Sequence, residues 1–130
     1  MAAITLTGLR LLIVEDEMMV AMMVEDMLAD LGCVVVDVAG TLSRGLALAS
    51  DTSVAFDGAI LDVNLGGDKV YPVAEVLTAR SIPFIFATGY GLAGIAESFS
   101  RVPALAKPYD ARDLERMLTT AFSRGAEAGG

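Results

Sequence analysis

The stretch AILDVNLGGDKVYP, residues 59–72, places one carboxylate, Asp62, directly after an apolar run and before a glycine-rich segment. The apolar run is too short for a helix and has no polar alternation, which is typical of a strand buried on both faces of a parallel sheet. Gly66 and Gly67 allow a tight turn, and Pro72 suits the first turn of a helix. The stretch therefore predicts a strand, a polar loop and a helix, with Asp62 at the end of the strand.

Similar apolar runs and helical patterns alternate along the whole chain. We expect strands over residues 9–14, 33–39, 58–61, 83–87 and 103–106. We expect helices over residues 17–31, 42–51 and 72–80, and a last helix after Asp110. Strands separated by helices form βαβ units, so the sequence predicts an α/β fold with a parallel sheet covered on both faces.

Length and composition indicate one globular domain. The chain has 130 residues, of which 55% are hydrophobic and 20% charged, which suits a single domain and argues against disorder. We expect an N-terminal extension over residues 1–8, the folded domain over 9–123 and a flexible tail over 124–130. The apolar runs are shorter than the ~18 residues of a membrane span. No basic segment precedes an apolar stretch at the N-terminus, so no signal peptide is expected either.

Charge and residue types restrict the chemistry. The formal net charge of −8 disfavours nucleic-acid binding, which depends on basic groups, and favours a protein or a cation as partner. The chain contains no histidine, which excludes histidine-based triads and metal sites. With Cys33 as its single cysteine the chain forms no internal disulfide, as fits a cytoplasmic protein, and we expect this side chain to be buried.

Polar residues follow four of the predicted strands. They are Glu15 and Asp16 after the first strand, Asp62 after the third, Thr88 after the fourth and Lys107 after the fifth. In open parallel sheets, ligands bind beyond the carboxyl ends of the strands, so we expect these side chains to meet. Three converging carboxylates repel one another unless a cation neutralises them. Oxygen ligands of this kind suit Mg²⁺.

These groups together suit phosphoryl transfer. The ammonium of Lys107 and the hydroxyl of Thr88 can hold the oxygens of a phosphoryl group during in-line transfer. Asp62 would be the nucleophile and would form an acyl phosphate. The loop after Asp62 can present the backbone carbonyl of Asn64 to the metal as a further ligand.

The chain from about residue 9 to residue 122 resembles the CheY-like receiver domain of two-component response regulators. The matching motifs, in chain order, are VEDE (14–17), LDVNL (61–65), ATG (87–89) and AKPYD (106–110). The resemblance implies a doubly wound, five-stranded parallel sheet of flavodoxin-like order 2-1-3-4-5. The run PFIFATGYG (83–91) is also similar to the FAT GUY subfamily, whose members are often single-domain receivers.

The resemblance also implies a function. The receiver would accept a phosphoryl group onto Asp62 from a histidine kinase or histidine phosphotransferase domain, with at most slow self-catalysed phosphorylation and dephosphorylation rather than enzymatic turnover. Asp16 would bind Mg²⁺ directly, Glu15 mainly through water, and Lys107 would pair with a phosphoryl oxygen. Asn64 and Tyr90, two positions after Asp62 and Thr88, would influence the phosphoryl lifetime by controlling water access. A cytoplasmic monomer or weak dimer would then bind a further protein, or act as a phosphate sink or shuttle.

Two features depart from the wider family. Many receivers carry tyrosine or phenylalanine three residues before the lysine, and its ring turns inward on activation; here the position is Ala104. We therefore expect Tyr90 or Phe86 to take over part of that role. Three glycines within 89–94 each disfavour a helix by about 1 kcal/mol. They predict a mobile segment over 89–100 that becomes ordered on phosphorylation or partner binding.

The first helix carries two apolar residues outside its predicted core face. That core face comprises Val20, Met23, Val24, Met27, Leu28 and Leu31. At 100° per residue, Met18 and Met22 then point away from the core. Flexible methionines beside an acidic site suit an adaptable protein interface, and we expect the phosphodonor domain to dock there. An equally simple interpretation is that Met18 and Met22 are two incidental surface side chains.

Other function classes remain open at this point. A phosphatase of the haloacid dehalogenase type also uses an Asp nucleophile and Mg²⁺, but it usually carries a second Asp two residues later, where this chain has Asn64. A receiver-like module that binds partners without phosphorylation is the second alternative, although no acidic or lysine position is lost. A mononucleotide-binding module is weaker still, because the loop after the first strand is acidic rather than rich in Gly, Ser or Thr.

Overall fold

The computed structural model describes residues 6–89 and 95–129, with side chains as far as Phe122. Its centre is a parallel five-stranded sheet in the order β2-β1-β3-β6-β7. The strands are β1 (Arg10–Val14), β2 (Val34–Ala39), β3 (Gly58–Asp62), β6 (Phe84–Thr88) and β7 (Ala104–Ala106). Counted along the chain, these five strands lie in the order 2-1-3-4-5, which confirms the predicted doubly wound fold.

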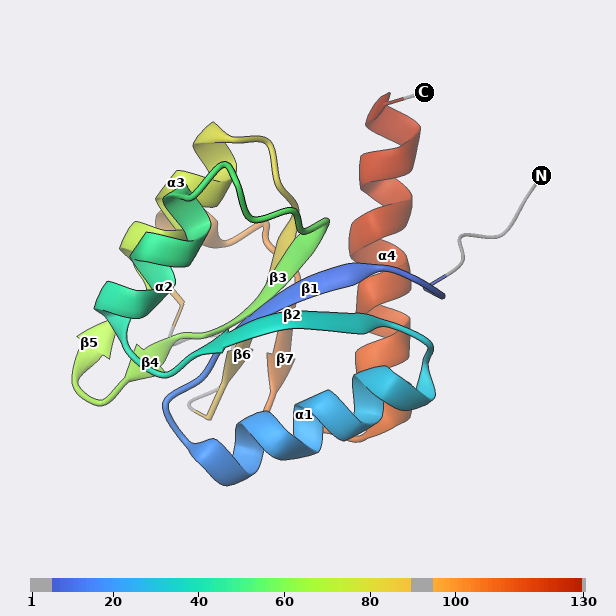
Figure 1. Cartoon of the computed structure of the whole chain (residues 1–130), viewed down its shortest axis with the longest axis horizontal. Coiled ribbons are helices and arrows are strands. Elements are labelled where there is room, and N and C mark those ends of the chain that lie inside the picture. Colours follow the sequence, from blue (N-terminus) through green and yellow to red (C-terminus); the bar gives the residue numbers. More distant parts are fainter. Residues whose placement is uncertain (1–5, 90–94, 130) are drawn as a thin grey trace.

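In the described part of the chain, four helices cover the two faces of this sheet. They are α1 (Met18–Asp30), α2 (Leu42–Ser50), α3 (Tyr71–Ala79) and α4 (Ala111–Gly129). Figure 1 shows α1 and α4 on one face and α2 and α3 on the other. Because both faces are covered, β3 and β6 are buried along their whole length, as their continuous apolar runs predicted.

Alternation along the strands divides the interior into two clusters. In β1, Leu11 and Ile13 belong to the cluster under α1 and α4, whereas Leu12 and Val14 belong to the cluster under α2 and α3. Successive side chains of a strand point to opposite faces of the sheet. Each face of the sheet is therefore covered by its own cluster and its own pair of helices.

Local signals in the sequence set the helix ends. Gly32, just after α1, has φ of +83°, a left-handed conformation that glycine adopts at low cost. The hydroxyl of Thr41 accepts a hydrogen bond from the backbone N–H of Arg44 at 3.1 Å and caps α2. At α4, Asp110 and Asp113 each accept a hydrogen bond from the other's backbone N–H, at 2.9 and 3.2 Å, a reciprocal capping box.

Two features differ from the predicted element pattern, and a third prediction is left open. A two-stranded antiparallel hairpin, β4 (Asn64–Leu65) and β5 (Asp68–Lys69), forms in the loop after β3. Helix α4 continues to Gly129, through most of the segment assigned to a flexible tail. In the segment 89–100, residues 90–94 lie outside the described residues, and the described remainder contains the 3-10 turn η2 (Glu97–Phe99). Mobility of that segment stays a prediction.

The buried face of α1 differs in two residues, Ala21 and Met23, from the predicted pattern. Its buried side chains are Ala21, Val24 and Leu28, so the small Ala21 lies in the core while Met23 is 54% exposed. The assignment of Met23 to the core was wrong. Met18 and Met22 are 72% and 58% exposed, which confirms that they point outward. Within the described residues, no helix combines the length and the apolar character that crossing a membrane requires.

Candidate functional site

The parallel sheet brings the predicted site residues to one edge. Asp62 is the last residue of β3 and Thr88 the last of β6, while Glu15 directly follows β1. In the strand register Asp62 pairs with Ala87. The ladder continues beyond the strands, because the backbone N–H of Lys107 donates to the carbonyl of Thr88 at 2.8 Å. The four strand ends therefore lie next to one another at the carboxyl edge of the sheet, as predicted.

Lys107 joins two of the carboxylates directly. Its ammonium nitrogen lies 2.8 Å from Oε1 of Glu15 and 3.3 Å from Oδ2 of Asp62. The side chains of Glu15 and Asp62 are only 4% and 7% exposed. Two carboxylates buried this deeply require a cation nearby, because burial strongly disfavours an unpaired charge. In this structure the ammonium of Lys107 supplies part of that compensation.

Glu15, Asp16 and Asp62 form a cluster that could hold a metal ion. Each offers one carboxylate oxygen, and these oxygens all lie within 4.8 Å of one another. Glu15 and Asp62 are buried, whereas Asp16 is exposed at the mouth of the site. An all-oxygen donor set open to water on one side fits a hard divalent cation that keeps part of its hydration shell.

The electrostatics show that the cluster lacks positive charge. Burial raises the pKa of Glu15 to about 7, and the hydrogen bond from Lys107 opposes this shift only in part. Burial by itself would lower the pKa of Lys107, but the hydrogen bond to Glu15 and the charge of Asp62 leave it above its usual value. The ammonium is therefore firmly charged, while Glu15 binds a proton readily near neutral pH. A divalent cation would compete for the place of that proton.

Asn64 is attached to the site by its backbone. Its N–H donates to Oδ1 of Asp62 at 3.3 Å, and its side-chain oxygen accepts a hydrogen bond from Lys69. Gly66 in the hairpin turn has φ of +57°, and a Cβ there would lie 3.7 Å from Oδ2 of Asp16. The hairpin thus passes close to the acidic cluster. The backbone carbonyl of Asn64 stays a predicted metal ligand.

Thr88 is completely buried at the end of β6. Two residues earlier, Phe86 lies in a group of rings supplied by α3, β6 and η2, with ring centroids 5.9 Å from Tyr71 and 5.7 Å from Phe99. The backbone N–H of Ala96 donates to the hydroxyl of Tyr71 at 2.8 Å. Phe86 is therefore fixed between other rings, whereas Tyr90, its proposed alternative, lies outside the described residues.

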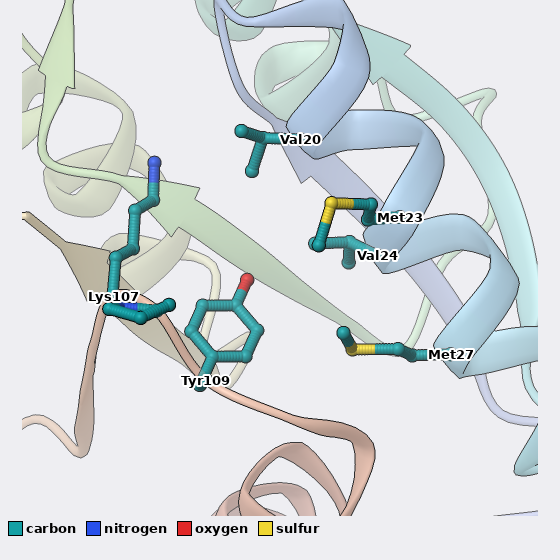
Figure 2. Close-up of a pocket in the computed structure, with 7 residues that line it drawn as sticks. Val20, Met23, Val24, Met27, Lys107 and Tyr109 are labelled. Carbon is teal, nitrogen blue, oxygen red and sulfur yellow. The ribbon is translucent and has the colours of Figure 1, made fainter.

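An apolar pocket borders the site on the α1 side. It has a volume of about 300 Å³. Figure 2 shows the side chains of Lys107 and Tyr109 on one wall, across from residues of α1 on the other. The α1 residues are Val20, Met23, Val24 and Met27. Burial raises the pKa of Tyr109 to about 12, so its hydroxyl stays neutral and the pocket wall carries charge only at Lys107.

Comparison with known structures shows which proteins this chain resembles. The chain is 42% identical to SdrG from Sphingomonas melonis Fr1, with a TM-score of 0.78 over 94% of this chain and 99% of that one. The BeF3-activated conformation of SdrG from Pseudomonas melonis Fr1 is 43% identical, with a TM-score of 0.73 over 88% and 94% of the two chains. The response regulator PhyR from Brucella abortus is 27% identical over 96% of this chain, with a TM-score of 0.77.

The chain belongs to the response regulator receiver domains. It spans only 53% of the PhyR chain, so the similarity to PhyR concerns one part of that protein. No protein-family model and no curated protein matched the sequence. The identification confirms the resemblance to receivers that the strand-end motifs indicated, and it places the protein in two-component signalling.

The receiver's site contains the predicted residues and two others. Glu15, Asp62 and Lys107 are in direct contact, and Asp16 completes the acidic cluster. Sequence reasoning missed Tyr109 in the pocket wall and Lys69 on the hairpin. For Lys69 a signal was available, because Gly-Gly between two short segments is a typical two-residue hairpin turn. Tyr109 had no comparable signal, since its burial depends on the packing of α1.

Proposed function

We propose that this receiver accepts a phosphoryl group onto Asp62 from a phosphohistidine donor, with Mg²⁺ bound by the acidic cluster. The observation that carries the proposal is the contact of one ammonium, that of Lys107, with both Glu15 and Asp62. This arrangement supports the proposal, because a carboxylate, an ammonium group and an acidic cluster that could hold a cation lie within one small site. A phosphoryl group needs these three elements during transfer.

The chemistry follows from the positions of these groups. An oxygen of Asp62 attacks the phosphorus in line, the phosphorus–nitrogen bond to the donor histidine breaks, and the imidazole leaves with the electron pair. Mg²⁺ would neutralise charge on the phosphoryl oxygens. Lys107 already lies 3.3 Å from Oδ2 of Asp62, so it can follow the phosphoryl oxygens as charge shifts onto the acyl phosphate. Thr88, at the end of the neighbouring strand, supplies a hydroxyl donor.

We further propose that the phosphodonor domain docks on the α1 side of the site. Met18 and Met22 are exposed beside the acidic loop, and on another side of α1 the pocket in Figure 2 offers a second apolar surface next to Lys107. Methionine side chains adapt to a partner's shape. A donor helix bound there would bring its histidine to the open side of the acidic cluster, where Asp16 is exposed.

The receiver would then signal by a phosphorylation-dependent change in protein binding, or would serve as a phosphate sink or shuttle. It would act in the cytoplasm as a monomer or weak dimer. The Phe-Ala-Thr-Gly run at 86–89 supports assignment to the FAT GUY subfamily. Half-buried Ala104 cannot provide an aromatic switch, and because Phe86 is fixed between other rings, Tyr90 is the better candidate for that role. The protein would not turn over substrate as an enzyme.

Acetyl phosphate labelling tests this proposal. The wild-type protein is incubated with acetyl phosphate and Mg²⁺, and its intact mass is measured. One added phosphoryl group is expected on the wild type, and none on Asp62→Asn or on wild type with excess chelator. An unchanged mass in the wild type would instead favour the binding-only receiver. Sustained hydrolysis of many phosphomonoesters would favour the phosphatase.

A further inference from the structure

The hairpin after β3 fixes the side chain of Asn64, two residues after Asp62. Asn64 and Lys69 are directly paired across its two strands, so their side chains leave the same face. The ammonium of Lys69 donates a hydrogen bond to the side-chain oxygen of Asn64. Gly66 and Gly67, both with positive φ, form the turn. A 3.0 Å hydrogen bond from the N–H of Val70 to the carbonyl of Val63, the residue after β3, closes the hairpin.

Asn64 is therefore held at two points. Its backbone N–H donates to Asp62 at 3.3 Å, and its side-chain oxygen is held by a cation from the opposite strand. An amide whose oxygen accepts from an ammonium has its NH₂ group turned to the other side, because the two ends of the amide differ in hydrogen-bonding capacity. Lys69 thus determines both the position and the orientation of the Asn64 side chain. Asn64 is half-buried and Lys69 exposed, so the lysine closes the hairpin from the solvent side.

We propose that Lys69 is a positioning residue that keeps the Asn64 side chain beside Asp62 and so limits the access of water to the phosphorylated site. This inference rests on the proposed function, because it concerns the lifetime of the phosphoryl group on Asp62. In the reaction concerned, the oxygen of a water molecule attacks the phosphorus and the bond from phosphorus to Asp62 breaks. The carboxylate is regenerated, inorganic phosphate leaves, and the water's protons pass to phosphate and solvent.

The direction of the effect follows from this arrangement. Without Lys69, the Asn64 side chain loses its partner on the solvent side and can leave the path of the attacking water. Hydrolysis should then be faster by roughly 3- to 10-fold, the factor that corresponds to one ordinary hydrogen bond, because Lys69 is exposed to solvent. The transfer step onto Asp62 should change little, because its cation is Lys107, which lies on β7's side of the site.

Phosphoryl lifetimes in a set of variants test the inference. Each protein is loaded with acetyl phosphate and Mg²⁺, freed of donor, and followed by intact mass. Lys69→Met should lose its phosphoryl group faster than wild type, while Lys69→Arg, which can still donate to Asn64, should retain nearly the wild-type lifetime. Arg101→Met is the matched control, because it removes one exposed positive charge before β7, at the opposite end of that strand from the site.

The double variant separates positioning from simple charge. Asn64→Ala alone should shorten the lifetime, and adding Lys69→Met to it should cause no further change. An unchanged lifetime in Lys69→Met would overturn the inference, and so would a full effect of Lys69→Met in the Asn64→Ala background. A wild-type protein that takes up no phosphoryl group would overturn the proposed function itself, which is a different result from equal lifetimes in loaded proteins.

Discussion

The metal-free protein should become less stable as the pH rises from about 4.5 to about 7. The cause is Glu15, whose side chain is 4% exposed and whose pKa is raised by burial from 4.5 to about 7. Between these values the folded protein holds a proton that the unfolded chain has already lost. The free energy of unfolding therefore falls as pH rises through this window, and it levels off above the pKa of the folded state.

The size of this effect can be bounded. A tenfold change in proton affinity corresponds to 1.36 kcal/mol, so Glu15 accounts for a loss of at most ~3 kcal/mol across the window. Other shifted carboxyl groups act elsewhere on the pH scale. Arg10 holds the pKa of Asp57 below its ordinary 3.8, so Asp57 stabilises the fold above that pH and loses this contribution only in more acidic solution. Its effect does not overlap with that of Glu15.

Urea unfolding at pH 5 and pH 8, in the presence of chelator, measures the effect. Wild type should lose more stability between these two values than Glu15→Gln, which has no proton to exchange but fills a similar space. Mg²⁺ should raise the stability of wild type more at pH 8 than at pH 5, because a protonated carboxyl binds the ion poorly. The reasoning is refuted if both proteins show the same pH profile without metal, or if wild type gains stability across the window relative to Glu15→Gln.

Two further predictions concern the scaffold of the site. A Cβ at Gly58 would lie 2.1 Å from the Phe122 ring, so Gly58→Ala should lower the free energy of unfolding, measured by urea titration, by about 1–3 kcal/mol. Gly40→Ala is the control, because its Cβ would meet nothing closer than 3.9 Å. Equal urea midpoints of the two variants would contradict the packing of Phe122 on Gly58. Tyr71→Phe keeps the ring but removes the hydroxyl that accepts the hydrogen bond from the N–H of Ala96. The free energy of unfolding should fall by ~1 kcal/mol, and amide hydrogen exchange at Ala96 should become faster. Unchanged exchange at Ala96 would exclude that hydrogen bond.

Much of the fold could be predicted because its signals are local. The apolar runs of β1, β3 and β6 match strands buried on both faces, and side-chain capping at Thr41 and Asp110 marks the starts of α2 and α4. The site followed from the topology, since every parallel strand delivers the residue after it to the same edge. That rule needs only the order of elements, not their packing.

The features that the sequence did not predict depend on tertiary contacts. The hairpin strands β4 and β5 have two residues each, too few to show an alternating pattern. In α1, the hydrophobic periodicity predicted that the large Met23 is buried, but the small Ala21 is the buried residue, at 1% exposure. A hydrophobic pattern locates the apolar side of a helix within about one residue's rotation, and the neighbouring elements decide which side chain is enclosed. The ion pairs of Lys107 likewise depend on the ends of three separate strands, β1, β3 and β7.

The ring group around Phe86 has a consequence for how this receiver can vary among species. Tyr71 stacks on Phe99 with centroids 5.4 Å apart and planes 6° from parallel, and both meet Phe86 edge-on. The three rings come from three distant parts of the sequence, yet a change in the size of one leaves a gap or an overlap at the other two. Substitutions at positions 71, 86 and 99 should therefore be inherited as matched sets, and a homologue that has lost one aromatic partner should show compensating changes at the others.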